Sequence, residues 1–282
     1  MDSLHTAAGH GRGIAIAVAP NGGRRSKADH PALPLSSAEL AGCAAECLEA
    51  GASMIHIHVR DDAGRHCLDV ERYRAAIAAI RDRVSDRLII QVTTEALGVF
   101  TPAQQIDLVR VLHPEACSIA LREIVPDASH ESAFDALLVW MRRERIVPQI
   151  ILYDRADLER LQDMFRRGLI PAEDIPVLFV LGRYTTNQQS SPADLQEFLQ
   201  ASSSFSHWSM CAFGQDEAAC AVSAALLGGN VRLGFENNLR LPDGTVAANN
   251  AALINPVRES LRLLGRKIET AETQRAALEA IW

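Results

Sequence analysis

The sequence predicts a (β/α)₈ barrel, and three observations lead to that fold class. Short apolar runs alternate with helix-like segments along the whole chain, and there are eight such runs. Most runs are continuously apolar, which is typical of parallel strands covered by helices on both faces. Eight alternations within 282 residues favour a closed barrel over an open, doubly wound sheet.

The predicted strands follow one another at regular intervals. Each is a short apolar run that ends in a polar or glycine-containing stretch. They cover residues 13–19, 52–59, 87–94, 115–121, 147–153, 176–182, 207–213 and 230–236.

A segment with helical spacing of apolar residues follows each predicted strand. The first helix opens at Ser36 and Ser37 and the second at Asp69, where a hydroxyl or carboxylate can cap the first turn. The later helices are expected over residues 102–111, 130–145, 156–167, 192–200, 217–227 and 250–263.

Composition argues against several kinds of partner. A net charge of −7 implies no strongly basic face, so we expect no nucleic acid. No apolar stretch approaches the roughly 20 residues of a membrane span. The six cysteines lack paired metal-ligand spacing and the first residues lack a signal-peptide core, which favours a cytoplasmic protein. We expect one domain over residues 1–282, with a flexible N-terminal segment over 1–12.

Polar side chains gather at the ends of the predicted strands. The active site of a (β/α)₈ barrel lies at the carboxyl ends of its strands, so these side chains are expected to converge on one rim. They are Asn21, Gly22, Gly23, His56, His58, Arg60, Thr93, Thr94, Glu95, Ser118, Arg122, Glu123, Gln149, Tyr153, Asp154, Arg232, Glu236, Asn237 and Asn238.

Two histidines two residues apart in a strand point to the same face. His56 and His58 at the mouth of a barrel, with Glu236 from the last strand, match a three-ligand Zn²⁺ site with an open position. Such an ion could polarise a substrate oxygen. An isolated H-x-H is more often a hydrogen-bonded structural pair, so the shared placement at strand ends is what favours a metal.

Arg232 is a guanidinium within an apolar strand, where it needs an anionic partner. Two interpretations stay open for it: a structural ion pair with Asp61 or Asp62, or a role in binding a carboxylate or stabilising an enolate. Thr93 and Ser118 are likewise either satisfied strand hydroxyls or groups of the site.

The connection from Asn21 to Pro34 is longer than the roughly 2–6 residues that are common between a strand and its helix. It carries Arg24, Arg25 and Lys27. It is either a solvated basic flap or a lid that meets an anionic ligand.

Longer stretches resemble the β-keto acid cleavage enzymes. They are HIHVRDDAGR followed by LDVERYRAAIAAIR, the early ADHPALPLSSAEL and the late GGNVRLGFENNL. The resemblance runs from about Gly13 to the last predicted helix. It implies a Zn²⁺-dependent barrel that joins a β-keto acid to acetyl-CoA and releases acetoacetate and a new acyl-CoA by a retro-Claisen-type exchange. It also implies a homotetramer.

The resemblance assigns roles to individual residues. The metal ligands fall on His56, His58 and Glu236, and the arginine that helps form and hold the enolate falls on Arg232. Two hydroxyl-bearing positions of the family's site fall on Thr93 and Ser118. With the strand-end residues, the expected substrate pocket comprises Asn21, Gly22, Glu95, Arg122 and Glu123.

Two departures from the family pattern concern the base and the substrate. A family member has an acidic residue after the metal-binding glutamate that assists proton abstraction, and here the catalytic position holds Asn237. That member also has a glutamate in the first loop for its substrate's ammonium group, and this chain has none there. We therefore expect a neutral or anionic substrate side chain, unless Glu95, Glu123 or Asp154 supplies the carboxylate.

Two other functions stay open at this point. A metal-dependent aldolase or hydrolase on the same barrel would cleave its substrate without acetyl-CoA. A non-catalytic barrel that binds a small acid would agree with Asn237 in place of an acid, and it would show no turnover.

Overall fold

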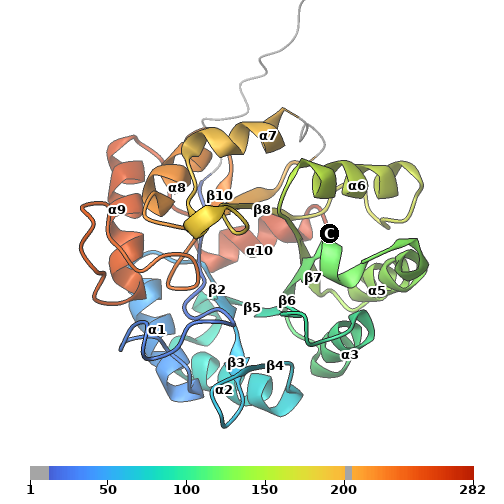
Figure 1. Ribbon diagram of the computed structural model, residues 1–282, viewed down its shortest axis with the longest axis horizontal. Helices are drawn as coiled ribbons and strands as arrows, with labels where there is room; N and C mark the ends of the chain where they lie inside the picture. Colours follow the sequence, from blue (N-terminus) through green and yellow to red (C-terminus); the bar gives the residue numbers. More distant parts are fainter. Residues whose placement is uncertain (1–12, 201–204) are drawn as a thin grey trace, which may run out of the picture.

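Eight parallel strands close into a barrel in the computed structural model, which describes residues 13–200 and 205–282. The strand order around the barrel is β1-β10-β9-β8-β7-β6-β5-β2, and helices surround it (Figure 1). The predicted (β/α)₈ barrel is therefore confirmed. The segment over residues 1–12 that was expected to be flexible lies outside the described residues.

Each barrel strand lies within one of the predicted apolar runs. The last strand pairs with the first in register Ala17 to Arg232, and this pairing closes the barrel. The strands are β1 Ile16–Val18, β2 Met54–Ile57, β5 Ile89–Thr93, β6 Ala116–Ala120, β7 Val147–Leu152, β8 Val177–Leu181, β9 Trp208–Ala212 and β10 Asn230–Leu233.

The main helices begin where the capping residues predict. Ser36 forms a capping box with Glu39, and the Asp69 carboxylate accepts a hydrogen bond from the Arg72 N–H. The helices are α1 Ser37–Glu49, α2 Val70–Val84, α3 Pro102–Leu112, α5 Glu131–Arg143, α6 Arg155–Arg166, α8 Glu217–Leu226 and α9 Asn250–Leu263.

Three local features differ from the sequence-based expectation. The run over 52–59 ends early, and a small hairpin of β3 (Val59–Arg60) and β4 (His66–Cys67) follows it. A short helix, α4 (Leu121–Ile124), follows β6 directly. The helix expected over 192–200 is a 3₁₀ turn followed by the single-turn α7 (Gln196–Leu199).

A helix that was not predicted, α10 (Ala271–Glu279), covers the amino-terminal end of the barrel. Leu278 packs there in one apolar cluster with residues of β2, β5 and β6. A hydrogen bond of 2.7 Å joins the Ser53 hydroxyl to the Gln274 amide oxygen beneath β2. The opposite, carboxyl-terminal end of the barrel is left for a site.

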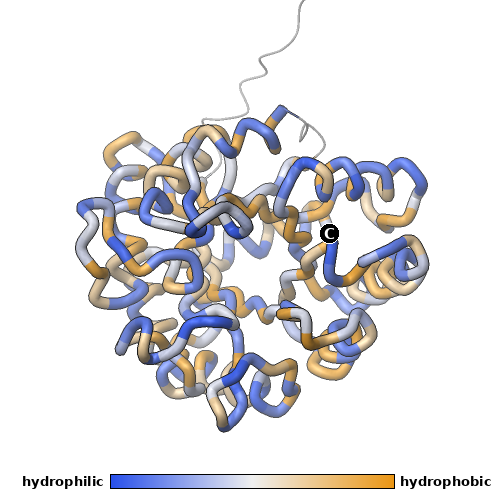
Figure 2. The backbone as a smooth tube through the Cα atoms, in the orientation of Figure 1, coloured by the Kyte–Doolittle hydropathy of each residue, from blue (hydrophilic) through white to orange (hydrophobic). Residues whose placement is uncertain are grey.

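The hydrophobic core lies between the barrel and its helices. Figure 2 shows apolar segments in the strands and alternation of apolar and polar residues along the surrounding helices. Tyr73 and Phe134 are fully buried between these layers. Within residues 13–200 and 205–282, no helix combines the length and apolarity that a membrane crossing requires.

Candidate active site

Strand ends place the three predicted metal ligands together at the mouth of the barrel. His56 belongs to β2 and His58 follows it, while Glu236 comes three residues after β10. Gly234 turns the chain there with φ of +137°, and a side chain on it would collide with the carbonyl oxygen of Ala19. The turn is therefore what brings the Glu236 carboxylate back over the barrel.

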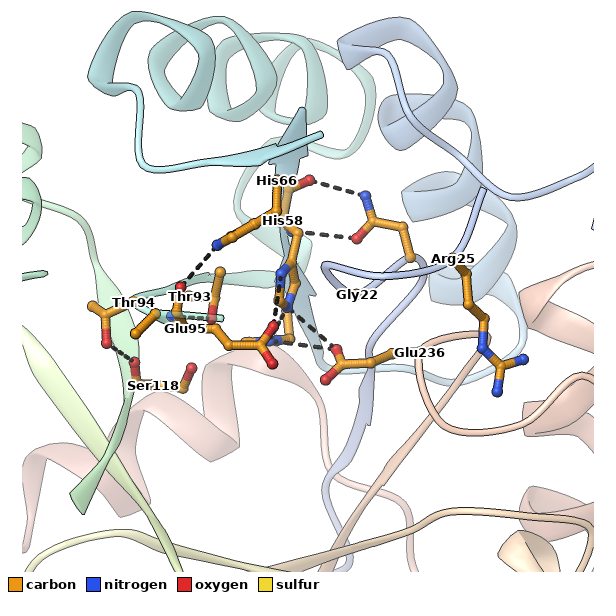
Figure 3. Close-up of polar contacts among 12 residues, drawn as sticks. Gly22, Arg25, His58, His66, Thr93, Thr94, Glu95, Ser118 and Glu236 are labelled. Carbon is orange, nitrogen blue, oxygen red and sulfur yellow. Dashed lines mark hydrogen bonds and ion pairs between the residues drawn. The ribbon is translucent and has the colours of Figure 1, made fainter. Parts of the chain in front are cut away.

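The ligand atoms of the triad His56, His58 and Glu236 have the spacing of a metal site. The His58 Nε2 atom lies 3.4 Å from the Glu236 Oε2 atom (Figure 3). The His56 Nε2 atom lies 3.1 Å from His58 Nε2 and 3.6 Å from the same Glu236 oxygen. Tetrahedral Zn²⁺ ligands at about 2.0–2.2 Å would be roughly 3.3–3.6 Å apart. Among the described residues, Glu236 Oε2 has no hydrogen-bond partner. The donor set thus fits a divalent ion.

A chain of amides inside the barrel fixes the protonation of His56. Gln149 donates to the Ser209 hydroxyl at 3.2 Å, and Gln91 donates to the Gln149 Oε1 atom at 3.1 Å. The Gln91 Oε1 atom therefore faces His56 Nδ1 at 2.9 Å as an acceptor. A proton on Nδ1 leaves the lone pair of Nε2 directed at the triad centre, as metal ligation requires.

The electrostatics of the triad favour the ligating forms of its members. Burial and then the charge of Arg232 lower the pKa of His56 well below 6.5. Burial alone would raise the pKa of Glu236, but Arg232 and the two histidines outweigh it and hold that pKa well below 4.5. A neutral imidazole beside an ionised carboxylate is the state that binds a divalent cation.

Arg232 has Glu236 as its anionic partner. Its Nη2 atom lies 3.2 Å from Glu236 Oε1 and 3.3 Å from the Cys211 sulfur. The alternative partners are engaged elsewhere, because Asp61 pairs with Arg65 and Asp62 with Arg72. The Arg232 Nε and Nη1 atoms have no partner within the described part of the chain. Two buried donor nitrogens are thus available to a ligand.

A cavity at the barrel mouth, the mouth cavity, brings these groups together with the two predicted hydroxyls. The Thr93 hydroxyl accepts a hydrogen bond from the Glu95 N–H at 3.0 Å, whereas the buried Ser118 hydroxyl has no partner among residues 13–200 and 205–282. The polar lining comprises the triad, Thr93, Glu95, Ser118, Arg183 and Arg232. The rest of the wall is formed by Ala120, Ile151, Tyr153, Val180 and Phe213.

The residues predicted to bind substrate separate into two groups. Glu95 lines the mouth cavity, and Asn21 and Gly22 line a second cavity directly beside it. Arg122 instead forms ion pairs with Asp154 and Asp157 and does not line the mouth cavity.

Glu123 is also outside the lining of the mouth cavity. It accepts a hydrogen bond from the Ala96 N–H at 2.8 Å, and burial raises its pKa. The Asn21 side chain binds the backbone, because its amide donates hydrogen bonds to the carbonyl oxygens of His58 and Pro34 at 2.9 and 3.0 Å. It holds the first loop against the end of β2.

Gly22 is the point at which the first loop touches the triad. Its φ is +58°, and a Cβ atom there would lie 2.6 Å from the Glu236 Cγ atom. We expect Gly22→Ala to displace the Glu236 carboxylate and weaken metal affinity by on the order of 10–100-fold. Metal titration of the chelator-stripped variant would measure this.

Gly64 provides the matched control for Gly22. Its φ is +75°, but a Cβ atom there would meet nothing within 4 Å. Both alanine variants should lose about 1–2 kcal/mol of stability to the left-handed backbone, and only Gly22→Ala should lose metal affinity. Equal metal affinities in the two variants would contradict the role given to Gly22.

Asn237 faces a buried carboxyl group that the sequence did not reveal as part of the site. Its amide donates to Glu217 Oε1 at 3.1 Å and to the Arg232 carbonyl oxygen at 3.3 Å. Glu217 also accepts hydrogen bonds from the Gly234 N–H and the Asn238 amide. Glu217 therefore holds the turn that presents Glu236, and Asn237 lies outside the lining of the mouth cavity.

Glu217 should make stability depend on pH. Burial raises its pKa to about 8 against the opposing hydrogen bonds. Between about pH 5 and 8 the folded chain holds a proton that the unfolded chain releases, so the free energy of unfolding should fall by about 1.4 kcal/mol per pH unit as pH rises. Glu217→Gln should lack this slope in denaturant titrations at several pH values.

The control for that slope is Glu272→Gln. Glu272 also lies in the first turn of a helix, but its side chain is exposed. This variant should keep the native pH dependence. Parallel slopes for the native chain and Glu217→Gln would show that Glu217 is not the titrating group.

Arg183 is a site residue that the strand-end argument missed. It follows β8 by two residues, and its side chain is only 12% exposed. Its Nη2 atom lies 3.3 Å from Glu95 Oε1, and its guanidinium stacks 4.9 Å from the Phe213 ring centroid. The sequence signal that could have identified Arg183 is its charge directly after the predicted strand over 176–182.

Known proteins similar to this chain point to one family. The family model described as beta-keto acid cleavage enzyme matches residues 13–279. Over 273 residues the chain is 30% identical to the 3-keto-5-aminohexanoate cleavage enzyme of Fusobacterium nucleatum, covering 94% of this chain and 97% of the relative. It is 27% identical to the 3-oxoadipate:acetyl-CoA acetyltransferase of Cupriavidus necator, with 93% of each covered.

A solved structure supports the fold alone. The apo structure of ObcA matches with a TM-score of 0.71 at 16% sequence identity, over 88% of this chain. The chain spans 65% of the length of ObcA.

Proposed function

The chain belongs to the β-keto acid cleavage enzyme family, and we propose that it exchanges acyl groups between a β-keto acid and acetyl-CoA with the help of a divalent metal ion, Zn²⁺. The observation that carries the proposal is the triad His56, His58 and Glu236 beside Arg232 in one buried mouth cavity. Acetoacetate and a new acyl-CoA would be the products.

The residues of the mouth cavity suit enolate chemistry. A divalent ion in the triad would polarise the keto group and make the carbon between keto and carboxyl groups more acidic. The free Nε and Nη1 groups of Arg232 would stabilise the negative charge of the enolate. The Ser118 hydroxyl is free to donate a hydrogen bond to a substrate oxygen.

Glu95 is the group we assign as proton acceptor. Asn237 cannot serve, because an amide is not basic at neutral pH. Glu95 is the one carboxylate in the described lining of the mouth cavity that is outside the triad. It lies 3.7 Å from His58 Nδ1, and Figure 3 shows it approaching that histidine from the side opposite Glu236.

Carbon–carbon bond formation and cleavage would then complete the exchange. The enolate carbon attacks the thioester carbonyl carbon of acetyl-CoA, and the CoA thiolate leaves. Attack of the thiolate on the original keto carbon breaks the bond to the former enolate carbon and forms the new thioester. The acetoacetate carbanion that departs takes up the proton held by Glu95.

The test is turnover of a β-keto acid panel with and without acetyl-CoA. With acetyl-CoA labelled in its acetyl group, the label should appear in acetoacetate and not in the new acyl-CoA. Cleavage without any thioester would favour an aldolase or hydrolase. Binding of keto acids without turnover would favour a non-catalytic barrel.

Assembly and location remain predictions from the sequence. We propose a homotetramer in the cytoplasm on the basis of the family resemblance and the cysteine usage. All six cysteines are free in the structure, as a reducing compartment requires. Light scattering of the purified protein would measure the oligomeric state.

A further inference from the structure

A second cavity, the outer chamber, lies directly beside the mouth cavity and shares part of its wall. Glu95, Arg183 and Glu236 line both spaces. The outer chamber is bounded further by the first loop, through Gly22 and Arg25, and by Gln188 of the connection after β8. A substrate whose reacting end lies at the triad can therefore place its other end in the outer chamber.

The charges around the outer chamber do not cancel. Three arginines line it, namely Arg24, Arg25 and Arg183, and the two carboxylates opposite are already engaged. Glu95 pairs with Arg183 at 3.3 Å, and Glu236 pairs with Arg232 at 3.2 Å. Positive charge is left over on the side of the first loop.

Of the three lining arginines, Arg24 and Arg25 form no ion pair within the described part of the chain, and Arg24 is exposed to solvent. Arg25 is half-buried, and its guanidinium donates a 3.4 Å hydrogen bond to the Asn237 carbonyl oxygen. Burial lowers its pKa, with Asp29, Glu217 and Glu236 only partly compensating from a distance. Figure 3 shows Arg25 on the first loop beside Glu236. A partly desolvated guanidinium with free N–H groups favours an anionic ligand.

Arg183 is held in place on the other side of the outer chamber. Glu95 and the Phe213 ring fix its guanidinium, and the Gln188 amide donates to its carbonyl oxygen at 3.4 Å. An anion between Arg25 and Arg183 would thus contact two guanidinium groups. That of Arg183 is held in place, and that of Arg25 has no ion-pair partner in the described chain. Arrangements of this kind bind carboxylates in preference to ammonium groups.

The carboxylates that could receive an ammonium group are all engaged. Asp154 pairs with Arg122, and Glu123 accepts hydrogen bonds from Ala96 and Gln105. Glu95 lines the outer chamber but already forms an ion pair with Arg183. An ammonium group in the outer chamber would meet more positive than negative charge.

We infer that the outer chamber binds a second carboxylate at the far end of the substrate, so that the substrate class is a β-keto dicarboxylic acid. The inference rests on the proposed function. A CoA phosphate is the other possible anion, but the long pantetheine arm separates it from the reacting thioester. A group directly beside the triad therefore belongs to the keto acid.

The test compares two substrates of equal chain length, 3-oxoadipate and 3-oxohexanoate, which differ by a terminal carboxylate in place of a methyl group. The native protein should prefer 3-oxoadipate in kcat/KM by about tenfold or more. Arg25→Gln should lower kcat/KM for 3-oxoadipate by about tenfold and leave that for 3-oxohexanoate within about twofold.

Lys27→Gln is the matched control, because it removes the same charge from the same loop. The Lys27 ammonium group pairs with Glu39 at 2.6 Å, and Lys27 does not line the outer chamber. This variant should behave as the native protein with both substrates. Melting temperatures of both variants would confirm that they fold.

Three outcomes would overturn the inference. The first is a native preference for 3-oxohexanoate or for 5-amino-3-oxohexanoate. The second is an equal effect of Arg25→Gln on both substrates. The third is a rise in KM for acetyl-CoA but not for acetyl-pantetheine in Arg25→Gln, which would assign the outer chamber to a CoA phosphate.

Failure of the proposed function gives a different result. No turnover of any keto acid, 3-oxohexanoate included, would count against the acyl exchange and not against the outer chamber. Calorimetric binding of 3-oxoadipate and 3-oxohexanoate would then test the outer chamber alone. The same tenfold preference, lost in Arg25→Gln, is expected, and equal affinities would overturn the inference.

Discussion

The His56→Ala variant should lose both its bound metal and its turnover. Two of the three ligand atoms would remain, and polarisation of the keto group would be lost with the ion. We expect kcat/KM to fall by on the order of a thousandfold or more, because this polarisation lowers the activation barrier by several kcal/mol. Metal analysis after dialysis, together with the acetyl-CoA-dependent assay, would measure both losses.

His66 offers the matched control for His56. Its ring lies 5.2 Å from the His58 ring, and its Nε2 atom hydrogen-bonds to the Glu95 carbonyl oxygen, outside the triad. His66→Ala should retain about one metal ion per chain. A His56→Ala protein that keeps both the ion and its turnover would remove the triad from the mechanism.

The Gln91 amide, which hydrogen-bonds to His56, allows a milder perturbation of the same metal site. Gln91→Leu leaves all three ligands in place but removes the acceptor that fixes the His56 proton. Metal affinity should fall by about 10–100-fold, and saturating metal should restore much of the activity. Restoration by excess metal separates this positioning effect from loss of a ligand.

The barrel and the triad could be predicted from the sequence because each rests on a local pattern. Alternating apolar runs and helical segments are typical of this fold, and strand ends in a barrel share one rim. His56 and His58 are fixed relative to each other by the period of a strand. Only the pairing with Glu236 needed the fold, since β10 closes the barrel beside β1 and β1 pairs with β2.

The rest of the site could not be predicted from strand ends alone. The end of a strand fixes how far along the barrel axis a residue lies, but it does not fix where the side chain of that residue points. Arg122 and Glu123 follow β6 at the expected height, but they belong to the short helix α4. Successive side chains in a helix point about 100° apart, which turns Arg122 toward α6 and Glu123 toward the Ala96 backbone. Both side chains therefore form contacts elsewhere on the rim, and neither lines the mouth cavity.

Other omissions have different physical reasons. α10 has a Thr270 cap but follows no predicted strand, so the strand–helix alternation gave no reason to expect it. Glu217 looked like an ordinary first-turn acid of a helix. Its burial beneath Asn237 results from contact between segments about twenty residues apart, which no local pattern encodes.

Arg232→Met should separate activity from stability. The side chain is 4% exposed, and two of its nitrogen atoms have no partner in the described chain, which is an arrangement that costs folding energy. Without the guanidinium, kcat should fall by about 10²–10³-fold, because the enolate loses its main source of charge stabilisation outside the metal. In the metal-loaded protein the melting temperature should not fall, since the bound cation still compensates Glu236.

The metal-free protein should respond to Arg232→Met in the opposite way. Glu236 would then be a buried carboxylate without Arg232, so the melting temperature of the stripped variant should drop below that of the stripped native chain. Arg232→Lys keeps the charge but not the forked donors, and its kcat should lie between native and Met. A Met variant that melts early even with metal bound, and whose activity loss matches its unfolded fraction, would make Arg232 a structural residue. Native-like melting with metal and a large loss of kcat would instead mean that its two unpaired donor nitrogens are kept for the reaction.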